Sequence, residues 1–196
     1  MRQTICLLVW SLALSAAAAL AQDARGGGAY AGEERRAIKS LSADEVEALL
    51  QGRGMGLAKA AELNHYPGPM HVLELAAELR LTPEQRAATR AAFDKMRDAA
   101  VRLGRGIVAR ERRLDALFAA GNITEAGLRA ETSAIARLQG SLRAAHLAAH
   151  LEMRRLLSPA QIKKYDELRG YAGGRQKGAQ EDGHGGGHGG GHHDKH

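Results

Sequence analysis

Cysteine, tryptophan and long apolar stretches are scarce in this chain of 196 residues. Cys6 is the only cysteine and Trp10 the only tryptophan, and both belong to the first 21 residues. The chain beyond residue 21 therefore has no thiol, which excludes disulfides, cysteine-ligated zinc and thiol catalysis there. Proline is also rare, and each proline marks a boundary between predicted elements: Pro67, Pro69, Pro83 and Pro159.

The one long apolar run lies near the N-terminus, from Ile5 to Leu20. It follows the basic residue Arg2 and ends in Ala19-Leu20-Ala21, a small-x-small cleavage sequence. This combination is typical of a secretory signal peptide, so we expect cleavage after Ala21 and export to the periplasm. The run is shorter than the roughly 20 residues of a comfortable membrane span, and a retained anchor is the alternative. After cleavage we expect no membrane span.

Charge and motif content argue against two classes of function. Cleavage would reduce the basic residues from 28 to 27, against 22 acidic ones. The two signs alternate through the middle of the chain, as on a solvated helix surface, so we expect no nucleic-acid partner. The sequence contains no HExxH, no nucleophile elbow and no recognisable pair of catalytic carboxylates. We therefore expect that the protein is not an enzyme.

Composition divides the chain into four regions. Residues 1–21 are the predicted signal peptide, and residues 22–32 are a Gly-rich linker that we expect to be disordered. Residues 33–172 are the only candidate domain, and about 140 residues suffice for one hydrophobic core. Residues 173–196 form a Gly/His-rich tail, which we expect to be disordered and to bind metal.

The domain has helical periodicity and almost no β pattern, which predicts an all-α fold. Two long helices joined by a tight turn make an antiparallel hairpin, and each would extend about 50 Å. The apolar faces of one hairpin need a cover, either a second copy in a dimer or the short N-terminal helices. The predicted helices cover residues 42–52, 53–64, 70–79, 82–120, 124–157 and 158–170.

Two helix starts are near copies, Leu81-Thr82-Pro83-Glu84-Gln85 and Leu157-Ser158-Pro159-Ala160-Gln161. Each places a hydroxyl side chain at the N-cap and proline at the first helical position. Two such starts around a hairpin, behind a signal peptide, resemble the LTxxQ signature of the Spy/CpxP family of bacterial periplasmic proteins. The resemblance covers roughly residues 40–171, and Ser158 replaces the threonine of the signature. The motif residues are Leu81, Thr82, Gln85, Leu157, Ser158 and Gln161.

The resemblance implies a cradle-shaped homodimer of helical hairpins in the periplasm. Members of this family act as ATP-independent chaperones, as inhibitors of envelope-stress sensor kinases or as heavy-metal sensors. The implied partners are therefore unfolded envelope proteins, or a membrane sensor or anti-sigma protein.

Histidine is abundant in the tail, where triglycine spacers separate the imidazoles. Imidazole binds zinc, nickel and copper, and flexible spacers let several rings converge on one ion. The alternatives are a purification tag, although a tag normally has consecutive histidines, or a neutral solubilising tail. The candidate tail ligands are His184, His188, His192, His193 and His196.

A second group of candidate ligands lies inside the domain. His146 and His150 share a helix face, and Met153 extends that line by about one turn. The resemblance implies that His71 and Glu74, from an N-terminal segment, face this group and complete a metal site. Alternatively, the two helix histidines are half-buried and hydrogen-bonded to carboxylates, or they sense pH, because imidazole titrates near 6.5.

These patterns favour a metal-responsive envelope-stress protein that binds zinc, nickel or copper and requires no resident cofactor. The alternative is a periplasmic chaperone or a modulator of a sensor kinase. A concave apolar surface with a basic rim would suit unfolded clients or an acidic sensor domain. The rim candidates are Arg97, Arg102, Arg105, Arg110, Arg112 and Arg113.

Overall fold

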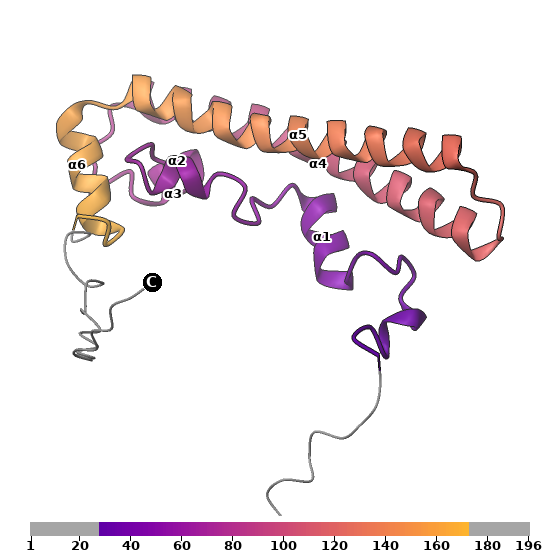
Figure 1. Ribbon diagram of the computed structural model, residues 1–196. Helices are drawn as coiled ribbons and strands as arrows, with labels where there is room; N and C mark the ends of the chain where they lie inside the picture. The colour runs from indigo at the N-terminus through magenta and orange to yellow at the C-terminus, as the bar shows by residue number, and fades with distance from the viewer. Residues whose placement is uncertain (1–27, 173–196) are drawn as a thin grey trace, which may run out of the picture.

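A computed structural model describes residues 28–172, and within that range the chain is all-helical (Figure 1). The predicted signal peptide, residues 22–27 of the predicted linker and the His-rich tail lie outside the described residues. None of the described helices is long and apolar enough to cross a bilayer. The elements are the 3-10 helix η1 (Glu33–Arg35) and the α-helices α1 (Ala43–Gln51), α2 (Lys59–Glu62), α3 (Pro69–Glu74), α4 (Pro83–Ala119), α5 (Glu125–Leu156) and α6 (Pro159–Leu168).

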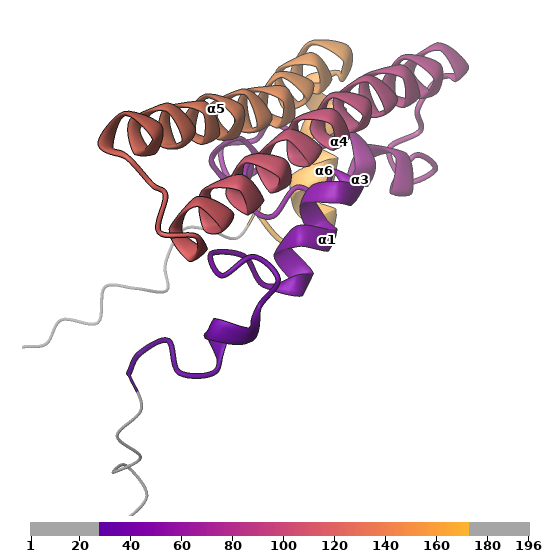
Figure 2. The ribbon, with the colours of Figure 1, turned by 90° about the vertical axis from the view of Figure 1, so that its right-hand side faces the viewer.

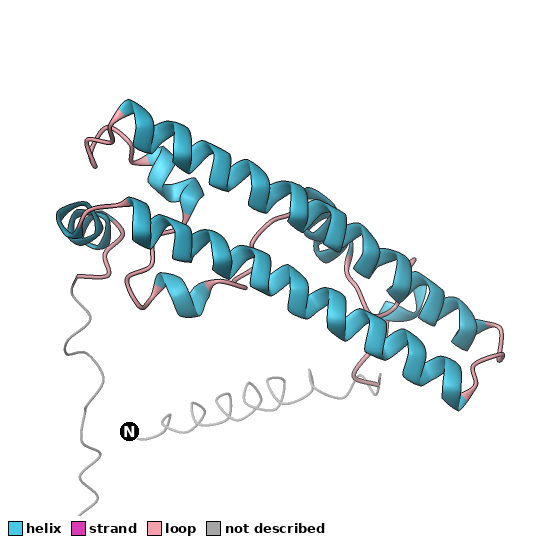
Figure 3. Ribbon diagram, turned by 90° about the horizontal axis from the view of Figure 1, so that it is seen from above, coloured by secondary structure: helices cyan, strands magenta, loops and turns pink. Residues whose placement is uncertain are grey.

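The predicted antiparallel hairpin is confirmed. Helices α4 and α5 have 37 and 32 residues and lie side by side along most of their length, as seen from above in Figure 3. Their first turns are capped as the sequence predicts, since Thr82 accepts a hydrogen bond from the Gln85 N–H and Thr124 accepts one from the Gly127 N–H. Each cap satisfies a backbone donor that has no partner within the helix.

The short helices lie under one face of this hairpin, as Figures 1 and 2 show. Helix α1 crosses α4 at Gly104, where an added Cβ would lie 2.0 Å from the Leu49 carbonyl oxygen. Only glycine allows that approach, so Gly104 fixes where α1 docks. The N-terminal segment thus provides the cover that the hairpin needs on this side, while the predicted dimer stays a prediction. Around the crossing, the buried cluster contains Ile38, Leu49, Ala100, Ile107, Val108 and Leu142.

Two of the short helices are shorter than the sequence predicts. In place of a helix over residues 53–64, the structure has turns followed by the four-residue helix α2. Gly52 and Gly56 have positive φ angles of 67° and 75°, and Met55 between them has a φ of 43°, so the chain cannot stay helical here. The helix predicted over residues 70–79 begins at Pro69 and ends at Glu74, and turns lead from there to Leu81.

The two motif glutamines meet at the end of the hairpin where α4 begins and α5 ends. The Gln85 Nε2 donates to the Gln161 Oε1 and the Gln161 Nε2 donates to the Gln85 Oε1, both over 2.9 Å. Each Nε2 also donates to a backbone carbonyl, that of Leu156 for Gln85 and that of Leu79 for Gln161. Each Oε1 in turn accepts the N–H of its own N-cap residue. We call this reciprocal pair the glutamine clamp, and it holds the start of α6 against the start of α4.

Beside the clamp, α6 turns away from the hairpin and packs beneath it (Figure 1). Its inner face contributes to a second buried cluster, made of Val72, Leu79, Ala92, Met153, Leu157, Ile162 and Tyr165. Tyr165 is fully buried there. The clamp and this cluster together set the position of Tyr165 and of the residues that follow it.

The opposite end of the hairpin holds a buried carboxylate. Glu131 is 5% exposed and pairs with Arg110 over 3.1 Å and with Arg113 over 2.9 Å. Both arginines were candidates for a basic rim, but here they bridge α4 to α5. Their charge is therefore largely compensated within the hairpin.

Candidate functional site

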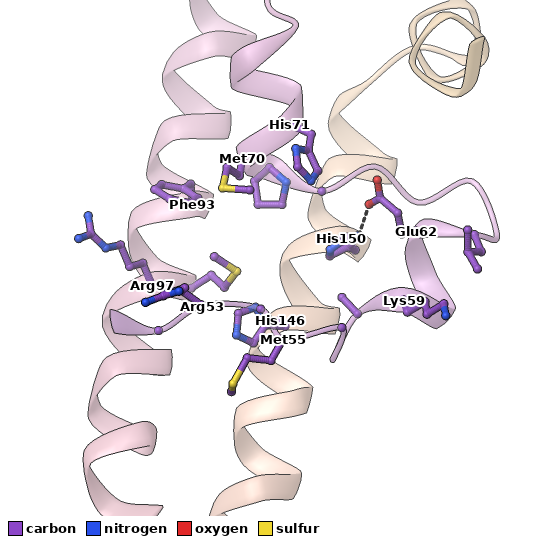
Figure 4. A pocket seen from close by; sticks show the side chains of 18 of the residues that line it. Arg53, Met55, Lys59, Glu62, Met70, His71, Phe93, Arg97, His146 and His150 are labelled. Carbon is purple, nitrogen blue, oxygen red and sulfur yellow. Dashed lines mark ion pairs between the residues drawn. The ribbon is translucent and has the colours of Figure 1, made fainter. Parts of the chain in front are cut away.

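An open cavity of about 630 Å³ lies between the hairpin and the short helices (Figure 4). Its size falls within the range of small-ligand sites. The residues that line it come from both long helices, the loop after α1, helix α2, the N-terminus of α3 and the segment after α6. The lining includes Met55, Leu63, Met70, Phe93 and Met96 among apolar residues, and Arg53, Lys59, Glu62, His71, Arg97, His146, His150 and Arg169 among polar ones.

His150 presents one ring nitrogen toward this cavity. Its Nδ1 lies 2.7 Å from the carbonyl oxygen of Tyr66. A carbonyl only accepts, so Nδ1 donates a proton to it, and in the neutral form of the ring the lone pair is on Nε2. A backbone acceptor on the far nitrogen is the usual support of a metal-binding histidine, because it fixes the tautomer and the ring orientation.

Gly68 keeps the space in front of the His150 ring open. A Cβ added at Gly68 would lie 3.1 Å from the Cε1 and 3.3 Å from the Nε2 of His150. It would also lie 3.3 Å from the Glu62 Oε2. The φ and ψ of Gly68 are −85° and 138°, which any residue adopts. The advantage of glycine here is therefore space and not backbone freedom.

His146 lies one turn earlier on α5 and is 4% exposed. Its buried Nε2 has no hydrogen-bond partner among the described residues. Burial above all, and also the neighbouring His150, lowers the pKa of His146 below its ordinary value. The neutral form of the ring is therefore favoured at pH 7. A buried, unpaired polar atom is costly unless a ligand satisfies it.

The structure brings some of the predicted ligands together and separates others. His71 lines the same cavity as His146 and His150, but its Nδ1 is bonded to Glu74 over 2.8 Å. Glu74 is exposed and does not line the cavity. Met153 is fully buried in the core cluster with Tyr165. Within residues 28–172, no three His, Cys, Asp or Glu side chains are grouped closely enough to hold an ion.

Glu62 is a site residue that could not be recognised from the sequence. Its Oε1 accepts hydrogen bonds from the hydroxyls of Tyr165 and Tyr171, and the Arg169 Nε lies 3.7 Å away. Burial, and secondarily the bond to Glu62, raises the pKa of Tyr165 above its ordinary value. Tyr165 also accepts the N–H of Gly68 over 3.3 Å. The segment after α6 is thereby tied to the wall of the cavity that faces His150.

Nothing in the local sequence marks Glu62, which is one of many charged residues on a short predicted helix. Its importance arises because the turn over residues 65–68 places α2 beside α6, about 100 positions later in the chain. The tail candidates His184, His188, His192, His193 and His196 lie outside the described residues.

The chain matches a known protein family. A family model described as "LTXXQ motif family protein" matches residues 68–169, a range that holds the glutamine clamp, both long helices and His146 and His150. No curated protein matches the chain. No solved structure matches it either.

Proposed function

This chain belongs to the LTXXQ motif family, the family of Spy/CpxP-type proteins, and from that premise we propose that it is a periplasmic metal-responsive binding protein and not an enzyme. The observation that carries the proposal is that His146, whose buried Nε2 has no hydrogen-bond partner among the described residues, lines the same cavity as His150. Two imidazoles on successive turns of one helix lie on the same face and can chelate one ion.

Two features of the surroundings of this pair support the proposal. The Tyr66 carbonyl fixes the tautomer of His150, and Gly68 leaves room in front of its ring. The two histidines alone provide two ligands, so other groups must complete the coordination of a bound ion. The five tail histidines are a further, separate source of imidazole on the same chain. We propose that the tail collects zinc, nickel or copper and that the cavity is the responsive site.

The test is a calorimetric titration of Zn²⁺, Ni²⁺ and Cu²⁺ into the chain without residues 1–21. The five tail histidines are replaced by Asn, so that only the folded site can bind. We expect one equivalent of at least one of these ions to bind. Changing His146→Ala together with His150→Ala should abolish that binding. His65→Ala is the control, because His65 is exposed and pairs with Asp166 away from the cavity lining. Binding only by the chain with an intact tail would refute the folded site.

A second candidate function, binding of unfolded envelope proteins, is favoured by the rim of the cavity. Met55, Leu63 and Met70 are 46%, 51% and 47% exposed there, although they are apolar. Arg97 and Lys59 border them, and neither forms an ion pair within the part of the chain that the structure describes. Suppression of client aggregation by the tail-substituted chain in the presence of a chelator would favour this role. An effect that requires the ion would favour the metal-responsive one.

A further inference from the structure

Apolar side chains that the core does not bury gather at the cavity between the hairpin and the short helices. The chain has five methionines, of which four lie in residues 28–172, and Met55, Met70 and Met96 line the cavity. Met55 and Met70 are 46% and 47% exposed, and Leu63, which also lines the cavity, is 51% exposed. Exposed apolar side chains around a cavity are typical of a ligand-binding surface. Methionine suits such a surface, because its flexible thioether chain adapts to apolar ligands of varied shape.

The charged residues of the same lining are mostly basic. Within residues 28–172 the lining contains four cationic side chains and a single carboxylate, that of Glu62. Figure 4 shows Arg53 and Arg97 on the side of α4 and Lys59 on the side of α2, so positive charge borders the cavity on two sides. A cleft lined by one sign of charge attracts ligands of the opposite sign. The four cations are Arg53, Lys59, Arg97 and Arg169.

Two of the four cations are close to carboxylates that compensate their charge. The Arg53 Nη2 lies 2.8 Å from the Glu47 Oε1. The Arg169 Nε lies 3.7 Å from the Glu62 Oε1. These two cations therefore contribute less to the excess of positive charge than the other two.

The other two cations, Lys59 and Arg97, form no ion pair within the part of the chain that the structure describes. Glu62 ends the short helix that Lys59 begins, but its carboxylate accepts hydrogen bonds from Tyr165 and Tyr171 instead. The cavity thus combines an apolar lining with two cations that lack a partner of opposite charge within residues 28–172.

A ligand that satisfies both features has an apolar body and a negative charge. We infer that the cavity binds a small amphipathic organic anion, a single carboxylate carried on an alkyl chain. The alkyl chain packs against the methionine and leucine side chains, and the carboxylate lies at the edge of the cavity that Lys59 and Arg97 border. The cavity volume of about 630 Å³ is that of a small-ligand site. The inference goes beyond the proposed function and requires no bound metal ion.

The first test compares four probes that differ in charge or in chain. Decanoate, decan-1-ol, decyltrimethylammonium and acetate are titrated by calorimetry into the chain without residues 1–21, in buffer stripped of metal ions. We expect one equivalent of decanoate to bind. Decan-1-ol should bind about 10-fold more weakly, because it cannot pair with the cations, and decyltrimethylammonium more weakly still. Acetate should not bind measurably, since it lacks the apolar chain.

Charge variants identify the cations that hold the carboxylate. Lys59→Gln together with Arg97→Gln should weaken decanoate binding about 10-fold and leave decan-1-ol binding unchanged. The matched control is Lys95→Gln together with Arg102→Gln, which removes the same charge at exposed positions of α4 outside the cavity lining. The control should keep the parent affinity for decanoate.

An apolar variant tests the site of the alkyl chain. Met70→Ser should weaken the binding of decanoate and decan-1-ol alike, by about 5-fold, because about half of the Met70 side chain is available for burial by a ligand. Leu151→Ser is the matched control, since Leu151 is also 47% exposed but does not line the cavity. The control should bind both probes as the parent does.

Methyl NMR locates the bound ligand. In protein labelled with carbon-13 at the methionine methyl groups, decanoate should shift the signals of Met55, Met70 and Met96. The signal of Met153 should stay in place, because Met153 lies in the core and does not line the cavity.

Several results would overturn the inference. They are equal affinities for decanoate and decan-1-ol, equal affinities of the charge variant and its control, and methyl shifts that spare the three cavity methionines. Binding of reduced α-lactalbumin or of phosphatidylglycerol vesicles without binding of decanoate would also overturn it, and would assign the exposed apolar residues to polypeptides or to a membrane. Ion binding by His146 and His150 is measured in the separate metal titration, so the proposed function and this inference can fail independently.

Discussion

Replacing Gln85 by Ala should destabilise the protein strongly, because Gln85 is half of the glutamine clamp. The change removes two bonds to the Gln161 amide and one to the Leu156 carbonyl, all part-buried. At about 1 kcal/mol for each bond, the free energy of unfolding should fall by about 3 kcal/mol. The bond to the exposed Thr82 N–H adds little, since water can replace it. For a domain of this size we expect the melting temperature to fall by about 10 °C.

A double-mutant cycle separates the clamp from general effects of losing a glutamine. Gln161→Ala removes the same two shared bonds and one to the Leu79 carbonyl, so it should also cost about 3 kcal/mol. The double variant loses four bonds in all, which predicts about 4 kcal/mol and a coupling energy of about 2 kcal/mol. Urea unfolding followed by circular dichroism measures all four corners of the cycle.

The control is Gln139→Ala, at an exposed position of α5 where the side chain makes no hydrogen bond within residues 28–172. We expect its stability to equal or slightly exceed that of the parent, because alanine favours helix. If the two clamp substitutions are additive to within about 0.5 kcal/mol, the reciprocal amide pair does not stabilise the fold and the reasoning is refuted.

Further predictions concern helix packing and the buried histidine. Gly104→Ala should cost about 3 kcal/mol in urea unfolding, since its Cβ would lie 2.0 Å from the Leu49 carbonyl oxygen and would displace α1. Gly140→Ala, where nothing lies within 4 Å, should instead stabilise the protein by up to about 1 kcal/mol, and equal effects of the two changes would contradict the close approach. Burial lowers the pKa of folded His146, so the unfolded chain binds more protons below about pH 6.5 and stability should fall as the pH falls there. Urea unfolding at pH 7.5 and 5.5 should show a smaller loss for His146→Leu than for the parent, and an equal or larger loss would contradict that assignment.

The long helices could be predicted from sequence because their boundaries depend on local chemistry. Thr82, Thr124 and Ser158 cap helices where the sequence places them, and the apolar periodicity between them is regular. The segment over residues 53–81 could not be predicted as well. Its turns depend on positive φ angles at Met55, His65 and Arg80, residues that seldom adopt them. The surrounding packing determines these angles.

In the candidate site, too, some residues could be predicted from the sequence and others could not. The sequence places His146 and His150 on one helix face, and the structure keeps both on the cavity. It also places Met153 near that line, but the side chain belongs to the core because α6 packs over it. Glu62 could not be found from sequence, since its partners Tyr165 and Tyr171 lie about 100 residues away. The motif glutamines, by contrast, form a clamp between helices and do not contribute to the cavity around the histidines.

The central claim, that His146 and His150 share one ion, is tested most directly by nitrogen-15 NMR of the imidazoles. The sample is the chain without residues 1–21 and with its tail histidines replaced by Asn. The metal-free protein should show His150 with its proton on Nδ1, as the Tyr66 carbonyl requires. Adding a diamagnetic ion, Zn²⁺ or Cu(I), should shift the Nε2 resonances of both histidines together and stop at one equivalent, while those of His65 stay in place. If neither ion shifts the two resonances, or if His150 carries its proton on Nε2, the account of this site is contradicted.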